Sequence, residues 1–409
     1  MSEVNVPKLR FREFEGEWVE KRLGDLGYFK NGLNKSKKDF GHGFPFVNLM
    51  DVFGKSTILE NNFGLVNANK KDLELYTLKK GDVLFIRSSV KKEGVGETAL
   101  ILNDLAHTTY SGFLIRFRDK NDDFDFLYKR YCFKTKRFRN SLLSLSTTSA
   151  NTNINQESLS LLKIYLPQKT EQQKIANFLT SIDQKIEQLT KKEKLLVAYK
   201  EGVMQKIFSR QIRFRDDNGE VYGDWVDGKL GDYGKLIKGL TYSPDNISDN
   251  GLLVLRSSNI QNNQISFKDN VYVDLEVSDE VLTRENDILI CVRNGSKRLI
   301  GKNIIIQGNL EKSTHGAFMT VFRGDSNKFI AHWFKTQMYY KEVHKNLGAT
   351  INSINGSDLK KFKTFFPQKA EQTKIANFLS SIDKKIEQVN RQIEESKGFK
   401  KGLLQQMFV

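Results

Sequence analysis

The sequence predicts an α+β protein in which two globular regions are separated by two long antiparallel coiled-coil helices, as a tandem repeat with pseudo-twofold symmetry. The first observation is a repeat: residues 167–188 and 367–388 match at 18 of 22 positions, with a constant offset of 200. The second is a heptad spacing of apolar residues within and after each of these segments. The third is the intervening sequence, where β-branched and aromatic runs alternate with Gly, Asn and Ser turns. A duplicated chain of this kind is suited to contact two similar places a fixed distance apart.

Length and composition favour a folded protein without a membrane anchor. The chain has 409 residues, 39% of them hydrophobic, which leaves room for two or three domains. No run of about 18 apolar residues is present, and the N-terminus lacks the apolar stretch of a secretory signal, so we expect a soluble, cytoplasmic protein without membrane contact. The two cysteines, Cys132 and Cys291, are too few for a disulfide framework or a multi-cysteine zinc site.

The charge of the chain favours a polyanionic partner. The formal net charge is +16, from 65 basic and 49 acidic residues, and the isoelectric point is about 9.5. Basic clusters occur in both halves, which suits a long groove or a duplex. Charge alone does not distinguish DNA from RNA or a membrane surface, and a basic protein without such a partner is the alternative.

Each copy begins with a short shared segment. The tripeptide RFR at 10–12 recurs at 213–215, and the pattern W-x4-LGD at Trp18 recurs at Trp225. Residues 402–408 match residues 202–208, so the chain ends where the first copy continues into its second leading segment. The two copies are therefore arranged cyclically, so that the first copy begins where the second copy leaves off. We therefore divide the chain at 1–166, 167–210, 211–366 and 367–409.

The globular regions share a skeleton although their sequences hardly match. The run VLFIR at 83–87 follows Asp82, and the run ILICVR at 288–293 follows Asp287. Both runs predict apolar strands, in mixed α+β domains dominated by short strands. Divergent sequence on a repeated scaffold indicates two different targets that are recognised in one manner.

Two long helices follow the globular regions. Pro167 and Pro367 suit a first helical turn, where a missing N–H is tolerated. Glu171 and Glu371 then lie near the positive end of the helix dipole, although a purely solvated role is as plausible. About 40 residues at 1.5 Å each give a rod of about 60 Å. The apolar seam predicts that the helices pair with each other, through Ile175, Leu179, Ile182, Ile186, Leu189, Leu196, Val203, Ile375, Leu379, Ile382, Ile386, Val389, Ile393 and Leu403.

Catalytic motifs are missing from the sequence. There is no Walker loop, no HExxH metal helix and no GxSxG elbow. The segment 94–99 fits G-x-G-x-x-A, but the following residues read as a strand, so a turn between strands is the better interpretation. The five histidines show no metal-ligand spacing, and we expect no metal site.

Polar and basic loops after the predicted strands are candidate DNA contacts. Arginine can bind guanine through two hydrogen bonds, and asparagine can do the same for adenine. Ordinary loop polarity is the alternative for each residue taken singly. The candidates are Lys37, Lys38, Arg87, Ser88, Lys91, Lys92, Tyr110, Arg256, Asn259, Arg293, Asn294, Lys297, Arg298 and His315.

These features together resemble the specificity subunits of type I restriction-modification systems. The resemblance covers the whole chain, and its most specific elements are the doubled PQKxEQxKIANFLxSID segments at 167–183 and 367–383 and the W-x4-LGD starts at Trp18 and Trp225. It implies a non-catalytic protein with two target-recognition domains, 1–166 and 211–366, each reading one half of a split site in double-stranded DNA. The helices at 167–210 and 367–409 would set the unread spacer and dock partner subunits.

The resemblance also implies the partners. Two modification subunits would methylate adenine with S-adenosylmethionine, and two restriction subunits would add ATP- and Mg-dependent translocation and cleavage, so no cofactor is expected on this chain. Two alternatives remain: a coiled-coil scaffold without DNA specificity, and a stand-alone DNA methyltransferase or nuclease.

Overall fold

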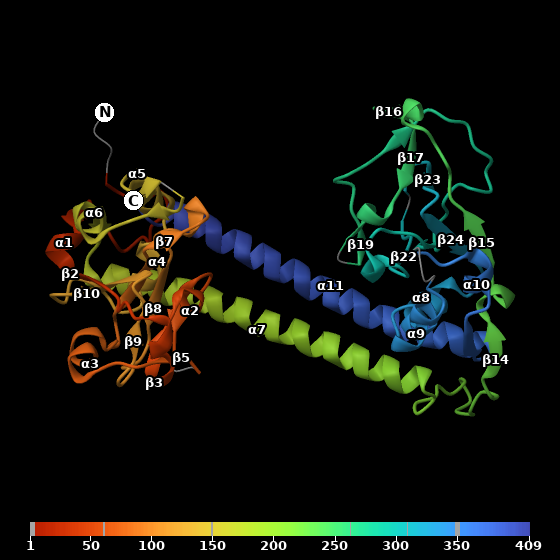
Figure 1. Cartoon of the computed structure of the whole chain (residues 1–409), viewed down its shortest axis with the longest axis horizontal. Coiled ribbons are helices and arrows are strands. Elements are labelled where there is room, and N and C mark those ends of the chain that lie inside the picture. The colour runs from red at the N-terminus through yellow and green to blue at the C-terminus, as the bar shows by residue number, and fades with distance from the viewer. Residues whose placement is uncertain (1–4, 60–61, 149, 262, 309, 348–351) are drawn as a thin grey trace. The chain divides into compact units, whose positions relative to one another are not determined.

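The structure is a computed structural model that describes residues 5–59, 62–148, 150–261, 263–308, 310–347 and 352–409. It divides into two compact units: unit 1 is Met1–Thr190 with Arg391–Val409, and unit 2 is Lys191–Asn390. Each unit holds one globular region and parts of both long helices, α7 (Lys169–Phe208) and α11 (Lys369–Gln406) (Figure 1). The expected α+β tandem repeat with two long helices is confirmed.

The globular part of unit 1 is built on a five-stranded sheet. Its strand order is β2 (Gly27–Asn31), β10 (Leu114–Asp119), β6 (Val83–Ile86), β8 (Thr98–Ile101) and β4 (Thr57–Ile58). Two three-stranded sheets complete it: β5 (Gly64–Val66), β3 (Phe40–Val47) and β9 (Thr109–Tyr110), then β11 (Thr147–Thr148), β12 (Thr152–Asn153) and β7 (Ser88–Ser89). A separate pair joins β1 (Val19–Arg22) to β13 (Lys163–Leu166). The short helices are α1 (Leu23–Leu26), α2 (Leu49–Val52), α3 (Lys70–Tyr76), α4 (Lys129–Cys132), α5 (Lys136–Ser144) and α6 (Gln156–Leu161).

Unit 2 has a similar plan, with a four-stranded main sheet and a four-stranded second sheet. Its main sheet has the order β15 (Lys235–Lys238), β24 (Met319–Arg323), β21 (Ile288–Cys291) and β22 (Asn303–Ile305). A second sheet has the order β16 (Ile247–Ser248), β20 (Tyr272–Val273), β17 (Leu252–Leu255) and β23 (Ser313–His315), with β17 and β23 parallel (Figure 1). The pairs β14 (Val226–Lys229) with β25 (Lys363–Phe366) and β18 (Ile260–Gln261) with β19 (Gln264–Ile265) complete the strands. Helices α8 (Asn327–Trp333), α9 (Gln337–Lys345) and α10 (Gly356–Lys360) follow.

The continuous apolar runs of β6 and β21 are explained by burial on both faces. Alternate side chains of a strand point to opposite sides. Val83 and Phe85 enter the core that contains the helix residues of unit 1, whereas Leu84 and Ile86 enter a second core under the β3–β9 sheet. The four residues of β21 divide in the same way between two cores of unit 2. A strand with two buried faces has no polar alternation, as the sequence showed.

In each unit the long helices pack on the globular region as well as on each other. Ile175 and Leu179 of α7 share the unit 1 core with Leu403 of α11 and with Trp18. Ile375 of α11 occupies the matching place in unit 2, beside the C-terminal end of α7. The two cysteines, Cys132 and Cys291, are buried free thiols.

Candidate nucleic-acid interface

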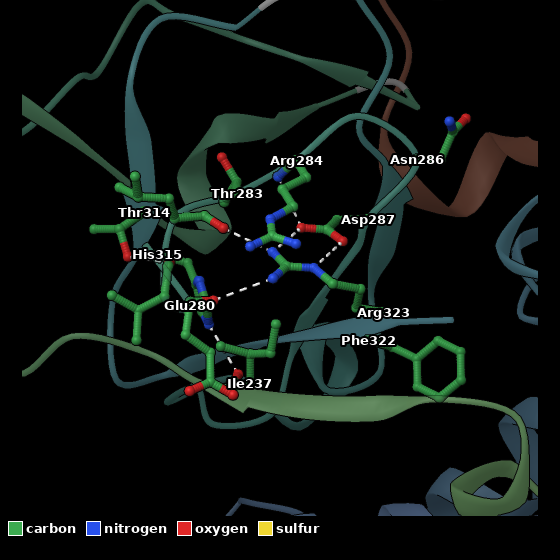
Figure 2. Close-up of polar contacts among 12 residues, drawn as sticks. Ile237, Glu280, Thr283, Arg284, Asn286, Asp287, Thr314, His315, Phe322 and Arg323 are labelled. Atoms are coloured by element: carbon green, nitrogen blue, oxygen red, sulfur yellow. Dashed lines mark hydrogen bonds and ion pairs between the residues drawn. The ribbon is translucent and has the colours of Figure 1, made fainter. Parts of the chain in front are cut away.

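A buried ion pair joins two strands beneath the polar loops of unit 2. Arg323, at the end of β24, donates from Nε and Nη2 to the two carboxylate oxygens of Asp287, at 2.8 and 2.7 Å (Figure 2). Its remaining donors bind the backbone carbonyls of Glu280 and Leu282, at 3.2 and 2.7 Å. Asp287 also accepts from the backbone N–H of Arg284 at 2.8 Å. A carboxylate with these partners is fixed in place, and so is the strand β21 that follows it.

Unit 1 contains the same construction. Arg118, at the end of β10, donates from Nε and Nη2 to Asp82, both at 2.6 Å, and from Nη2 to the carbonyl of Thr77 at 3.1 Å. Asp82 accepts in addition from the N–H of Lys79 at 2.8 Å. The acidic residue before each central strand is thus a structural anchor in both units.

A close backbone approach fixes the loop that follows β9 or β23. A Cβ atom at Gly32 would lie 2.1 Å from the carbonyl oxygen of Ser111, and one at Gly239 would lie 2.1 Å from that of Gly316. Only glycine lets two chain segments meet at this distance. The leucine after each glycine then donates its N–H to the carbonyl before the loop, at 2.7 Å in both units.

This approach creates a concave surface in unit 2, which we call the recognition cavity. Its volume is about 360 Å³, and it is formed by the chain after β15, after β17 and between β23 and β24. Asn294 donates to Ser257 Oγ at 3.1 Å, and the Arg293 guanidinium lies 5.7 Å from the centroid of the Phe318 ring. Three of the loops predicted from sequence therefore converge here. The lining residues are Leu240, Thr241, Tyr242, Arg256, Ser257, Ser258, Gly316, Ala317, Phe318 and Met319.

Most of the predicted DNA-contact residues have accessible side chains. The exposed ones are Lys37, Lys38, Lys91, Lys92, Arg293, Lys297 and Arg298. Four others are half-buried: Arg87, Ser88, Arg256 and Asn294. Arg256 forms an ion pair with Asp269 at 2.9 Å, so only part of its donor capacity faces outward.

Three predicted contacts are buried and do not present their side chains to a partner. The Tyr110 hydroxyl donates to the carbonyl of Lys30 at 3.1 Å, and His315 Nε2 lies 3.0 Å from the carbonyl of Ile237. Burial lowers the pKa of His315, which favours the neutral imidazole. Asn259 closes a 3-10 turn: it accepts from the N–H of Arg256 at 2.8 Å and donates to the carbonyl of Ser266 at 2.9 Å. We assign all three to the framework, because the Tyr110 hydroxyl, the Asn259 amide and His315 Nε2 have internal partners.

The hydrogen bonds also define which loop residues of the two units correspond. Tyr110 is the counterpart of His315. Arg87 is the counterpart of Val292, not of Arg293. The N–H of Arg87 binds the carbonyl of Phe113, and the N–H of Val292 binds the equivalent carbonyl of Phe318. Arg87 is half-buried and donates to the carbonyl of Gly112 at 3.3 Å. Arg87 and Arg293 are thus not equivalent side chains.

The predicted helix-pairing residues are all wholly or partly buried. The buried ones are Ile175, Leu179, Ile182, Ile375, Leu379, Ile382, Val389, Ile393 and Leu403. The half-buried ones are Ile186, Leu189, Leu196, Val203 and Ile386. The sequence predicts that these heptad residues pack the two long helices against each other. In the structure, those in the N-terminal third of each helix also form part of a globular core.

Charged residues of the repeated segment have roles that the sequence reasoning missed. Glu171 is 1% exposed and accepts from Arg10 through both oxygens at 2.8 Å, so the solvated alternative is wrong. In unit 1, Lys400 binds Asp183 at 2.5 Å, and in unit 2, Lys200 binds Asp383 at 2.5 Å. The offset of 200 between the two lysines and between the two aspartates was the available signal. The Gly-Leu pair at 32–33 recurs at 239–240, with an offset of 207, and was a comparable signal.

Two classes of site are not found in the part of the chain that the structure describes. No group of three or more His, Cys, Asp or Glu residues there could hold a metal ion. No described helix is both long and apolar enough to cross a membrane.

Comparison with known proteins identifies the family. The sequence profile of the type I restriction modification DNA specificity domain matches twice, at residues 15–197 and 222–396. The type I restriction enzyme MjaX specificity subunit described for Methanocaldococcus jannaschii is 26% identical over 98% of this chain and 95% of its own length. The EcoKI specificity subunit of Escherichia coli is 28% identical over 43% of this chain and 40% of its own length. The crystal structure of the S subunit from M. genitalium has the same fold, with a TM-score of 0.59 and 16% identity over 99% of both chains. The chain therefore belongs to the type I restriction-modification DNA specificity family, as a non-catalytic DNA-recognition subunit with two tandem copies of the specificity domain.

Proposed function

We propose that each globular region reads one half of a bipartite target in double-stranded DNA. The observation that carries this proposal is the recognition cavity with its convergent polar loops, built on a framework of ion pairs and glycines that both units share. The framework is constant while the loop residues differ, as required for two different half-sites. The net charge of +16 supports a polyanionic ligand.

The candidate base contacts fall into two groups. Arg293 and Asn294 stand beside the recognition cavity and present the donors that read guanine and adenine edges. Exposed lysines such as Lys37, Lys38, Lys91 and Lys92, which lie outside strands, suit phosphate contacts. Lys297 and Arg298, in a 3-10 turn that follows the Arg293–Asn294 loop, are also candidate phosphate contacts.

The long helices serve in this proposal as spacer and docking platform. Their 40 and 38 residues correspond to about 60 Å of helix. Two modification subunits that use S-adenosylmethionine, and two restriction subunits that use ATP and Mg, would assemble on the chain and supply all catalysis. The site of action is the cytoplasm, where the DNA substrate lies.

A gel-shift series against salt tests DNA recognition, with and without the modification subunit. The assembled protein should bind one bipartite sequence, with an affinity that falls steeply as salt increases. The Arg293→Ala change should relax specificity in one half-site only, whereas Lys297→Ala should weaken binding equally across sequences. A salt-insensitive protein without sequence preference would instead be a scaffold, and methylation or cleavage by the isolated chain would make it an enzyme.

The spacer role has a separate test. Deletion of one heptad from each helix should leave both half-sites readable and shorten the preferred spacer in a selection from random DNA. An unchanged spacer would refute this role of the helices.

A further inference from the structure

Phe113 and Phe318 occupy the same position in the two units. Each lies in the loop before the long strand of its main sheet, β10 or β24. The carbonyl of Phe113 accepts from the N–H of Arg87 at 2.8 Å. The carbonyl of Phe318 accepts from the N–H groups of Val292 and Arg293, at 3.0 and 3.1 Å. Both loops are therefore fastened to the end of the central strand in one way.

The two rings are exposed although their surroundings are rigid and buried. Phe113 is 58% exposed and Phe318 is 57% exposed, whereas the following residues, Leu114 and Met319, are buried. In both loops the N–H of this following residue binds the carbonyl three positions earlier, at 2.8 Å. A single exposed phenylalanine needs no explanation. Here the flanking sequences, YSG and HGA, have diverged while the aromatic residue and its exposure are the same in both units.

One guanidinium group lies at each of the two loops. Phe318 lines the recognition cavity, and the guanidinium of Arg293 lies 5.7 Å from its centroid. Next to Phe113, the half-buried guanidinium of Arg87 binds the carbonyl of Gly112 at 3.3 Å. A rigidly held aromatic face beside a cation is the arrangement that stacks on a nucleobase and attracts its phosphate. An apolar side chain in such a place can also separate two stacked base pairs.

We propose that Phe113 and Phe318 are DNA-contact residues, each of which stacks on a base of the half-site read by its own unit and partly unstacks that base from its neighbour. The inference rests on the proposed reading of DNA by both units. It adds an aromatic contact to the hydrogen-bonding residues predicted from the sequence.

The variants Phe113→Ala and Phe318→Ala test the proposal in the protein assembled with its modification subunits. Loss of one stacking contact should weaken site-specific binding by about tenfold. The Phe→Tyr variants retain the aromatic face and should keep most of the affinity. Matched controls are Phe53→Ala in unit 1 and Phe267→Ala in unit 2, because both of these side chains are also exposed. Thermal unfolding confirms that every variant is folded.

Target DNA that carries 2-aminopurine at successive positions of each half-site reports the unstacking. With the unaltered protein, fluorescence should rise at one position in each half-site. The increase should disappear in one half-site for Phe113→Ala and in the other for Phe318→Ala. It should persist in both controls.

Three results would overturn the proposal. Alanine variants that bind like the controls would show that the rings do not contact DNA. Weaker binding without any fluorescence change at any position would assign the rings to an edge contact, such as a thymine methyl group, and not to stacking. Loss of fluorescence in both half-sites with a single variant would remove the assignment of one ring to one half-site. If the unaltered protein shows no site-specific binding at all, the proposed function fails instead, and the two failures are thus distinguishable.

Discussion

Replacement of Glu371 by glutamine should destabilise unit 2 more than replacement of Glu171 destabilises unit 1. Glu371 is fully buried. One of its oxygens accepts from Arg213 Nε at 2.9 Å and from the N–H of Phe214 at 3.3 Å. The other accepts from Arg213 Nη2 at 2.9 Å and from the indole N–H of Trp225 at 3.0 Å. A glutamine places its NH₂ group against two donors, whichever way the amide turns.

Glu171 is a natural control for this change. It accepts from Arg10 Nε and Nη2 only, and the indole N–H of the equivalent Trp18 has no acceptor among the described residues. In the Glu171→Gln variant the side-chain NH₂ group therefore faces one donor, not two. Breaking a buried ion pair costs about 3–5 kcal/mol, and one further lost bond to a charged group costs about 1.5–3 kcal/mol. We expect the free energy of unfolding of unit 2 to fall by that additional amount relative to unit 1.

Hydrogen exchange measured by mass spectrometry can separate the two units, which need not unfold together. Peptides that cover β14 and β25 report on unit 2, and those that cover β1 and β13 report on unit 1. We expect Glu371→Gln to accelerate exchange in unit 2. We expect Glu171→Gln to cause a smaller acceleration, confined to unit 1. Equal accelerations would refute the assignment of the extra cost to the additional donors of Glu371, the Phe214 N–H and the Trp225 indole N–H.

Two further predictions concern the groups around Asp183 and Asp383 of the long helices. Lys200→Met should lower the stability of unit 2 by about 1 kcal/mol more than Lys400→Met lowers that of unit 1. The reason is that Asp183 keeps its bonds to Arg130 and Tyr131, at 3.0 and 2.8 Å, when Lys400 is replaced. Hydrogen-exchange rates of helix peptides measure the two effects, and equal effects would contradict the prediction. The pKa of His332 is lowered from 6.5 to about 3, mainly by burial and then by the charges of Lys200 and Lys335. The charge of Asp383 has the opposite effect on this pKa. Below pH 6.5 the unfolded chain therefore binds a proton that the folded chain excludes, and the stability of unit 2 should fall by about 2 kcal/mol between pH 6.5 and 5. Chemical denaturation at both pH values would show this slope, which His332→Gln should remove.

The features predictable from the sequence were those written in local periodicity or in the repeat. The heptads indicated α7 and α11, and the apolar run at 83–86 indicated a strand. The doubled segment indicated two similar units. These signals depend on residue order alone, so no knowledge of contacts between distant segments was needed.

The features that escaped prediction depend on those distant contacts. Tyr110 and His315 looked like surface polar residues, but the parallel pairing of β9 with β3 and of β23 with β17 places them in the interior. The pairs Arg118–Asp82 and Arg323–Asp287 join residues 36 positions apart in sequence. Nothing in the local sequence shows which arginine meets which aspartate. The repeat could have shown it, because both partners recur with an offset of 205.

The features that the two units share limit where specificity can reside. The anchors Asp82 and Asp287 and the close approach at Gly32 and Gly239 are the same in both units, so their alteration would disturb the strands and not the choice of base. Buried Tyr110 and His315 differ chemically, yet each contacts a carbonyl of the neighbouring strand. Divergence at a buried position is therefore not evidence for base reading. Only divergence at accessible positions qualifies. Arg87 and Arg293 each lack an arginine counterpart in the other unit, but Arg293 is exposed whereas Arg87 is half-buried and donates to the carbonyl of Gly112. Arg293 is therefore the stronger candidate for reading one half-site alone.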